Sequence, residues 1–409
     1  MEFPIGVRVL MKRYSTRKKI LILGGSHRDI PLIQASQALG YYVITLGVIK
    51  TYLGHNYSDE KFLVDFSDLG SVKQIIKNEQ VDYILAGCSE AAYISSVILS
   101  NELGVGCYDL LETAQLLHNK WAFKKFCLEN NISTPDAQHY TPQLDLTELS
   151  FPLAIKPTTL SGGQGVDVVN SVYELRKAVI ESEKFSTDLI LEEYVEGQLI
   201  AYSLFLQDQK VIYGFVGDDK SYLNKYLINT AYPVSLKQVV LDKMRDDVEK
   251  IASQLKLVDG MFHLQIIIKD DIPYVIDVTR RIPGDLYPKL IEYCDGVAYS
   301  KAVVKSYLGE MLENEFERNS DLNSKQQKFV IRHCVMASSN GTIKDVKVDH
   351  ILHEKICYRL DLIEAGQTVN NFMIDVIAII FIELDGRDEK VIDNINSLIS
   401  PIIETKVES

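Results

Sequence analysis

The segment KKILILGGSHRDIPLIQASQALGYYVITLG, near the start of the chain, constrains the fold more than any other feature. An apolar run leads into two glycines, a stretch of helical length follows, and a second apolar run closes the segment. This order predicts a strand, a tight turn, a helix and a second strand. VDYILAGCSEAAYISSVILSNELGV repeats it, with a strand expected at 82–87 and a helix to about 103. We therefore expect a doubly wound parallel α/β domain from residue 18 to about 112.

The glycine pair Gly24-Gly25 raises the question of a nucleotide site. Ser26, His27 and Arg28 follow it, so the GxGxxG spacing of dinucleotide-binding turns is not completed. We favour a structural strand-to-helix turn over dinucleotide binding.

The pattern changes after this domain. A helix is expected to end near Asn130-Asn131, and Pro135 opens an extended run. FPLAIKPTTLSGGQGVDVVNSVYELRKAVIESE then reads as strand, glycine-rich loop, strand and helix, and more strands follow, which predicts an antiparallel α+β unit. Beyond a charged stretch after residue 312, strands and a terminal helix are expected. The predicted domains are 1–114, 115–312 with a lid subdomain at about 135–196, and an α+β extension at 313–409.

Composition excludes several classes of protein. The 409 residues carry a formal net charge of -13 without clusters of Lys and Arg, which argues against a nucleic-acid surface. The six cysteines show no metal-ligand spacing, so we expect reduced thiols. No apolar run reaches the roughly 18 residues of a membrane span, and the basic N-terminus lacks the features of a secretory signal. A cytoplasmic protein without a membrane partner is expected.

Lys156 ends the apolar strand FPLAIKP, where a cation needs an anionic partner. Five residues later SGGQG offers a turn whose backbone N–H groups can approach phosphate oxygens. A strand lysine followed by a glycine-rich loop favours a phosphate site. The alternative is a lysine whose stem lies along apolar surface beside an ordinary turn.

The order HNKWAFKKF, AIKP, SGGQGV, LILEEYVEG and HLQIIIKDDIPYVIDVTRRIPGD resembles the ATP-grasp superfamily in its carboxylate-amine ligase branch, which includes biotin carboxylase-like and carbamoyl phosphate synthetase-like members. The resemblance covers roughly residues 18–310. It implies an N-terminal parallel α/β domain, an ATP-grasp domain with antiparallel sheets, and a C-terminal α+β extension.

The resemblance assigns nucleotide contacts to residues of this chain. Lys120 would match the lysine before the first helix of the nucleotide-binding region, and Lys156 the strand lysine that touches the α-phosphate. The loop over the β- and γ-phosphates would comprise Ser161, Gly162, Gly163, Gln164 and Gly165. Glu192 would receive the adenine amino group, Tyr194 and Val195 would offer backbone contacts to the purine edge, and Glu193 is grouped with them. Leu199 stands where the family often has a ribose-binding acid, a role for which Glu196 is the substitute in this chain.

The same resemblance places metal ligands on two successive strands at Gln265, Asp277 and Thr279. Magnesium prefers oxygen ligands, often one or two carboxylates completed by phosphate oxygens and water. ATP and Mg²⁺ are therefore the expected cofactors, with Mn²⁺ as an alternative metal. The other interpretation is that these polar side chains are only structural.

Arg280 and Arg281 follow on the second strand and are the candidate catalytic residues. Neighbouring side chains of a strand face opposite sides, so one should enter the cleft, and the register of the motif favours Arg281. Its planar guanidinium suits a carboxylate or an acyl phosphate. His263 is expected to be structural rather than a substrate contact. The segment 217–235 is either a substrate loop, with Lys220, Lys225 or Tyr232 near the acceptor, or an ordinary surface loop.

The resemblance implies an enzyme, an ATP-dependent ligase that activates a carboxylate as an acyl phosphate and joins it to an amine, releasing ADP and phosphate. The expected partners are small-molecule carboxylate and amine substrates, and a homodimer is compatible with the sequence. The alternatives are a carboxylase or phosphotransferase on the same fold, or a nucleotide-binding protein without turnover.

Overall fold

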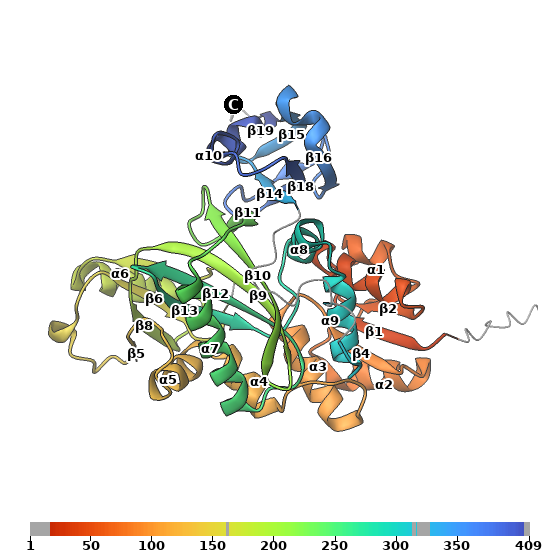
Figure 1. Ribbon diagram of the computed structural model, residues 1–409, viewed down its shortest axis with the longest axis horizontal. Coiled ribbons are helices and arrows are strands. Elements are labelled where there is room, and N and C mark those ends of the chain that lie inside the picture. Colours follow the sequence, from red (N-terminus) through yellow and green to blue (C-terminus); the bar gives the residue numbers. More distant parts are fainter. Residues whose placement is uncertain (1–16, 161–162, 313–315, 317–327, 405–409) are drawn as a thin grey trace, which may run out of the picture.

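A computed structural model describes residues 17–160, 163–312, 316 and 328–404. Figure 1 shows an N-terminal part in red and orange, a central part in yellow and green that reaches to the opposite side, and a C-terminal part in blue above them.

The N-terminal part is built on a parallel sheet with the strand order β3-β2-β1-β4. Its apolar strands are almost fully buried, because helices cover them. The elements are β1 (Lys19–Leu23), α1 (Ile30–Ala38), β2 (Tyr42–Leu46), β3 (Glu60–Phe62), α2 (Leu69–Glu79), β4 (Tyr83–Ala86) and α3 (Glu90–Leu103). The predicted parallel α/β domain is confirmed.

The turn at Gly24-Gly25 is filled by the protein itself. A carboxylate oxygen of Asp29 accepts hydrogen bonds from the backbone N–H groups of Gly25 and Ser26, each at 2.8 Å. A Cβ atom on Gly25 would collide with the ring of His55. Since a carboxylate already occupies the place that a phosphate would take, the turn is structural.

Two helices lead into a four-stranded antiparallel sheet with the order β5-β8-β6-β7, which falls in the range predicted for the lid subdomain. One face of this sheet carries its own small core against α6. The elements are α4 (Leu111–His118), α5 (Lys120–Glu129), β5 (Ala137–His139), β6 (Leu153–Pro157), β7 (Asp167–Val169), α6 (Val172–Glu183) and β8 (Leu189–Glu193).

The largest sheet has eight strands in the order β13-β12-β9-β10-β11-β14-β18-β16, all of them paired antiparallel. Helix α7 packs on it through Val240, Met244, Val248 and Ile251, whose spacing of three and four residues places them on one face. The central elements are β9 (Gln198–Gln207), β10 (Lys210–Ser221), β11 (Ile228–Pro233), α7 (Gln238–Leu255), β12 (Gly260–Lys269), β13 (Ile272–Thr279), α8 (Tyr287–Asp295) and α9 (Tyr299–Tyr307).

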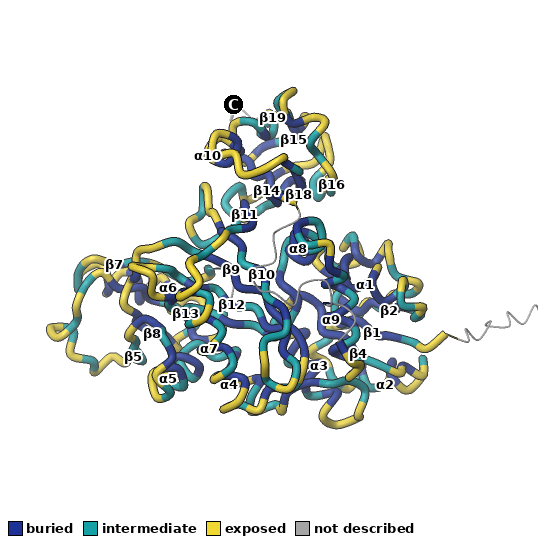
Figure 2. Tube along the Cα trace, in the orientation of Figure 1, coloured by how far each residue is buried: buried dark blue, intermediate teal, exposed yellow. Residues whose placement is uncertain are grey.

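The C-terminal part continues this sheet. Thr230 and Ala231 of β11 pair with His333 and Arg332 of β14, so the sheet runs across the domain boundary expected at 312/313. Strands β14 and β18 are buried almost throughout (Figure 2). The elements are β14 (Phe329–Met336), β15 (Gly341–Val348), β16 (Ile356–Asp361), β17 (Thr368–Val369), β18 (Val376–Leu384), α10 (Glu389–Leu398) and β19 (Ile399–Glu404).

One expectation for this part is wrong. The described chain does not end in a helix, because β19 follows α10 and pairs with β15. The alternation in ISPIIE is short, and the pairing partner lies more than fifty positions earlier in the sequence, so only the folded chain reveals the strand. The predicted fold class, parallel α/β followed by antiparallel α+β, is confirmed.

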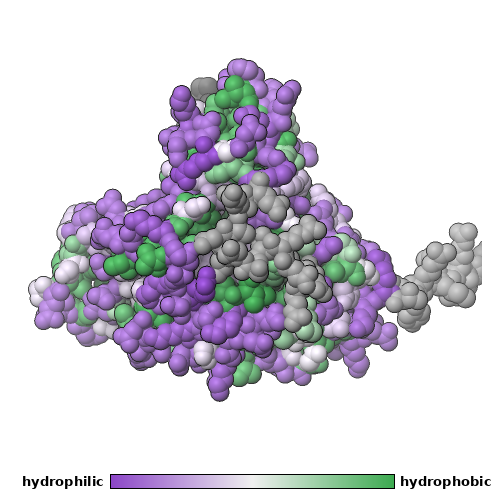
Figure 3. Space-filling view, viewed as in Figure 1, coloured by the Kyte–Doolittle hydropathy of each residue, from purple (hydrophilic) through white to green (hydrophobic). Residues whose placement is uncertain are grey.

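The surface agrees with the acidic, polar composition. Figure 3 shows a largely hydrophilic face with apolar residues in small patches. Among the described helices, none combines the length and the apolar character needed to cross a membrane. All six cysteines are free thiols.

Candidate functional site

A cavity of about 560 Å³ lies between the lid subdomain and the largest sheet. Strands β6 and β8 line one side, β9, β12 and β13 line the other, and the segment from the end of β10 to the start of β11 closes it. This volume is in the range of pockets that hold small-molecule ligands. The predicted nucleotide and metal residues can be compared with it one group at a time.

Lys156 and Glu192 form an ion pair across the lid sheet. Lys156 lies on β6 and Glu192 on β8, where it pairs with Ala154, so both side chains share one face of the sheet. Lys156 Nζ donates to Glu192 Oε2 at 2.5 Å, and both residues line the cavity. Glu192 is therefore the anionic partner that we expected for Lys156.

Lys124 is a second lysine on the same carboxylate. From α5 its Nζ lies 3.5 Å from Glu192 Oε1, and it donates to Thr134 Oγ1 at 2.5 Å. Burial lowers the pKa of Lys124, while Glu192 opposes this shift. Burial would raise the pKa of Glu192, but the charges of Lys124 and Lys156 outweigh it and hold that pKa below its ordinary value. Lys124 is not among the residues predicted from the sequence. Its one signal there is that it follows Lys120 by four residues on a predicted helix, which puts both side chains on the same face.

Lys120 connects the start of α5 to β13, one of the two strands predicted to hold a metal. Asn119 caps α5 by accepting the backbone N–H of Ala122, which fixes Lys120 in the first turn. Its Nζ donates to the carbonyl oxygen of Leu160 at 2.7 Å and lies 3.9 Å from Asp277 Oδ2. Lys120 and Lys156 thus reach the same cavity from different elements.

The glycine-rich loop follows β6 at the mouth of the cavity. Gly163 and Gly165 have positive φ angles of +72° and +69°, which favour glycine. Gly163 lines the cavity and packs so closely on Tyr226 that a Cβ atom there would collide with it. Gln164 lies between the two glycines and is not among the lining residues. The predicted residues Ser161 and Gly162 lie outside the described part of the chain.

The strand end after Glu192 supplies the edge of the cavity expected to face a purine. Glu193, Tyr194 and Val195 all line it. Glu193 is exposed and Val195 is buried. Glu196 and Leu199 line the same cavity. Glu196, the substitute proposed for the ribose-binding acid, therefore lies beside the residues expected to face the purine.

Gln265 and Asp277 meet at the far side of the cavity. They are direct partners in the antiparallel pairing of β12 and β13, and both line the cavity. Thr279 does not line it, and its hydroxyl oxygen accepts the backbone N–H of Arg281 at 3.3 Å. No group of three His, Cys, Asp or Glu side chains suited to a metal occurs in the described ranges. The donor set fits a magnesium ion that arrives with a nucleotide and takes most of its oxygens from phosphate and water.

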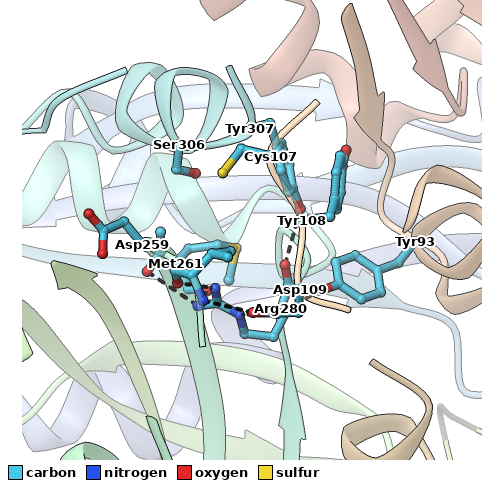
Figure 4. Close-up of a pocket in the computed structure, with 11 residues that line it drawn as sticks. Tyr93, Cys107, Tyr108, Asp109, Asp259, Met261, Arg280, Ser306 and Tyr307 are labelled. Atoms are coloured by element: carbon cyan, nitrogen blue, oxygen red, sulfur yellow. Dashed lines mark hydrogen bonds and ion pairs between the residues drawn. The ribbon is translucent and has the colours of Figure 1, made fainter. Parts of the chain in front are cut away.

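Arg280 does not line the cavity, and its guanidinium lies among Asp109, Met261 and neighbouring residues (Figure 4). Its Nε donates to Asp109 Oδ2 at 3.0 Å, and its other nitrogens donate to the carbonyl oxygens of Met261 and Val258, each at 2.6 Å. The side chains around it enclose only about 10 Å³, too little for a substrate. Arg280 therefore joins the N-terminal part to β12, which does not favour the catalytic role assigned to it.

Arg281 follows the end of β13 at Thr279 and, like Arg280, does not line the cavity. It is partly buried, and its Nη1 lies 3.9 Å from the sulfur of Cys88, just before α3. Burial would raise the pKa of Glu90 at the start of α3, but His118, whose Nδ1 lies 3.9 Å from Glu90 Oε1, and the charges of Lys120 and Arg281 hold it below its ordinary value. Arg281 thus lies at the junction of the N-terminal part and β13, next to the metal strands.

His263 is held as a neutral side chain. Burial lowers its pKa to about 3, and the charge of Arg281 adds to this shift. Its Nδ1 lies 2.7 Å from the hydroxyl of Ser203, and its ring packs edge-on against Tyr287. These contacts favour the structural interpretation.

Part of the segment 217–235 forms strand, and part of it lines the cavity. Lys220 and Lys225 line the cavity, whereas Tyr232 is buried against Phe329 in the C-terminal core. The structure therefore removes Tyr232 from the proposed acceptor contacts. Asp219, which the sequence did not single out, also lines the cavity, and burial raises its pKa to about 7 against the charge of Arg332.

Known proteins resemble this chain in sequence and in fold. The family model of the ATP-grasp domain matches residues 117–285. Formate-dependent phosphoribosylglycinamide formyltransferase of Wolinella succinogenes is 23% identical over 64% of this chain and 70% of that protein. The carbamoyl phosphate synthase large chain of Pseudothermotoga lettingae is 21% identical over 76% of this chain, but this chain spans only 30% of that protein.

Solved structures show the same fold. Phosphoribosylglycinamide synthetase from Anaerococcus prevotii superposes with a TM-score of 0.76 at 20% identity, covering 95% of this chain and 100% of that one. L-amino acid ligase from Bacillus licheniformis gives 0.81 at 17% identity, covering 95% and 99%. The motifs from Lys120 to Arg281 fall within the range that the family model matches, so the resemblance drawn from the sequence is confirmed.

Proposed function

We propose, from the premise that this chain belongs to the ATP-grasp superfamily in its carboxylate-amine ligase branch, that it is an ATP-dependent ligase. It activates a carboxylate as an acyl phosphate and joins it to an amine. The observation that carries the proposal is one cavity lined by Lys156 and Gly163 on the side of the lid subdomain and by Gln265 and Asp277 on the other side. Lysines and an acidic side chain that line one space suit a triphosphate held with a metal ion.

The residues of the chain divide into a nucleotide end and a reacting end. Tyr194 and Val195 border the purine, and Lys120 and Lys156 hold the phosphates together with the glycine-rich loop. Gln265 and Asp277 would hold Mg²⁺, which when bound neutralises phosphate charge. Thr279 would contribute only by moving toward the cavity from its contact with Arg281.

The chemistry requires positioning more than a side-chain nucleophile. A substrate carboxylate oxygen bonds to the γ-phosphorus while the bond from that phosphorus to the bridging oxygen of ADP breaks. The amine nitrogen then bonds to the acyl carbon, inorganic phosphate leaves, and the amine loses a proton to water or buffer. Arg281, which lies at the junction with α3 and outside the cavity lining, would bind the anionic acyl phosphate from there.

The experiment is a binding and turnover screen. Titration calorimetry with ATP and magnesium tests the site, and release of ADP is then measured over pairs of carboxylates and amines. The names of similar proteins suggest the first panel: formate, bicarbonate and L-amino acids. ADP release that requires both a carboxylate and an amine supports the ligase.

Two alternatives have distinct outcomes in this screen. Release of ADP with bicarbonate or another oxyanion as the acceptor would indicate a carboxylase or phosphotransferase. Binding of ATP without ADP release across the panel would indicate a nucleotide-binding protein without turnover. The last alternative is favoured by one observation, the single carboxylate that the described metal strands present to the cavity at Asp277. Absence of ATP binding would contradict all three.

A further inference from the structure

Lys124 is a buried cation that the proposed chemistry leaves without a role. Its side chain is 2% exposed, as is that of Glu192, whereas Lys156 is 15% exposed and lines the cavity. Keeping a lysine charged in so dry a place is costly, so its presence calls for an explanation in terms of a partner.

Glu192 is the partner, and it is shared by two lysines. Lys156 holds Oε2 at 2.5 Å and Lys124 lies 3.5 Å from Oε1. The other hydrogen-bond partners of Lys124 are uncharged, namely Thr134 Oγ1 at 2.5 Å and the carbonyl oxygen of Val275 at 3.3 Å. Within the described residues, Glu192 is the one carboxylate within ion-pair distance of Lys124.

The Lys156 ammonium group cannot pair equally well with Glu192 and with a phosphate at the same time. In the structure its ammonium group lies on the carboxylate, and binding of a phosphate would draw it toward the cavity. If Glu192 had no other cation, it would then become a buried carboxylate without a counter-charge, because the adenine amino group assigned to it is neutral. Such a carboxylate would retain Lys156 or take up a proton, and either response would weaken binding.

We propose that Lys124 is a positioning residue that keeps Glu192 ionised and paired, so that Lys156 can leave this carboxylate for a phosphate of the bound nucleotide. This inference rests on the proposed function, because it presupposes ATP in the cavity. Lys124 itself touches neither nucleotide nor substrate. Its buried position on α5 makes it a fixed counter-charge, while Lys156 at the cavity wall is the lysine that moves.

The test compares ATP binding by the full chain and its Lys124→Met variant, measured by calorimetry with Mg²⁺ between pH 6 and 8 in buffers of different ionisation enthalpy. The dissociation constant of Lys124→Met should rise by about tenfold or more, because Glu192 now competes for Lys156. Binding should also take up about one proton, as the buried carboxylate loses its remaining cation. A merely structural role would not produce this proton uptake.

The chain offers two matched controls. Lys125→Met changes the next residue of the same helix, which is 61% exposed and whose ion-pair partner in the described part of the chain is Glu129, and it should bind ATP like the unchanged protein. Lys124→Arg keeps the charge and should bind without proton uptake. The double variant Lys124→Met with Glu192→Gln removes both buried charges, so it should recover at least about threefold of the lost affinity and take up no proton.

Each outcome decides the inference. Unchanged affinity in Lys124→Met, or a loss without proton uptake that Glu192→Gln does not relieve, overturns it while the proposed function stands. Failure of the unchanged protein to bind ATP overturns both together. If Lys124→Met does not fold, the double variant carries the test: it must fold and bind ATP without proton uptake, and failure to do so overturns the inference.

Discussion

Gln265 and Asp277 lie directly opposite each other on antiparallel strands, and both face the cavity. The Asp277 side chain is 38% exposed, and its Oδ2 lies 3.9 Å from Lys120 Nζ. An amide and a carboxylate in this arrangement offer oxygen to a metal with only one negative charge. The amount of negative charge at this position therefore controls how tightly a metal can be held.

Asp277→Asn should lower the apparent affinity for magnesium by about tenfold or more, because the charge of the metal site falls to zero. Turnover should fall with it. The measurement is ATP consumption over a magnesium titration. Asp271→Asn, an exposed change in the turn before β13, is the control and should have no effect. Gln265→Glu should act in the opposite direction, and equal magnesium dependence in all three variants would remove the metal from these strands.

Lys156→Ala should weaken ATP binding by about 10- to 100-fold, the range expected for losing a charged hydrogen bond to phosphate. The fold should persist, because Glu192 keeps Lys124 as a partner. Calorimetry gives the affinity, and the thermal midpoint reports the fold. Lys184→Ala on the exposed side of the lid subdomain is the matched control. An affinity like that of the unchanged protein would mean that the phosphate site lies elsewhere.

Arg280→Met should destabilise the protein by about 3–5 kcal/mol, since it leaves Asp109 as an unpaired buried carboxylate. Arg281→Met should change the free energy of unfolding by only about 1 kcal/mol or less, because its contacts are long and its side chain is partly exposed. Turnover should fall in Arg281→Met. Denaturant unfolding and ADP release measure the two effects, and a reversed pattern would exchange the roles of the two arginines.

Asp219 should make the stability depend on pH. Its pKa is about 7 in the folded protein, against an ordinary value of 3.8, so the folded state binds more protons than the unfolded state between these values. Stability should therefore fall as pH rises from about 4 to 7, by up to about 1.4 kcal/mol per pH unit. Denaturant unfolding at several pH values measures the slope. Asp219→Asn should flatten it, and an unaltered slope would show that other groups dominate.

Gly163→Ala should lower ATP affinity, because the added Cβ atom collides with Tyr226 and must displace the loop from the cavity mouth. The positive φ angle adds strain of about 1 kcal/mol. Gly366→Ala is the matched control, since that glycine also has a positive φ but open space around it. Equal affinities in the two variants would show that the Gly163 contact does not shape the nucleotide site.

The local patterns that predicted elements were those with strong periodicity. Alternating strand and helix signals around the glycine pair placed the parallel sheet, and Lys156 before SGGQG marked the cavity wall. Strand β19 was not predicted, because its alternating run is short and only the pairing with β15 identifies it as a strand. The predicted division at 114/115 and 312/313 remains a proposal, since the sheet that joins β11 to β14 runs across the second boundary.

The sequence by itself determined which residue types could hold a nucleotide and a metal, because their order along the chain is a local property. Tertiary structure alone decided their partners. It turned Arg280 to Asp109 and Arg281 toward α3, brought Lys124 from a helix onto Glu192, and placed Asp219 in the cavity. The physical reason is that charge pairing depends on distances of a few ångströms between segments far apart in sequence, and only the packed fold sets those distances.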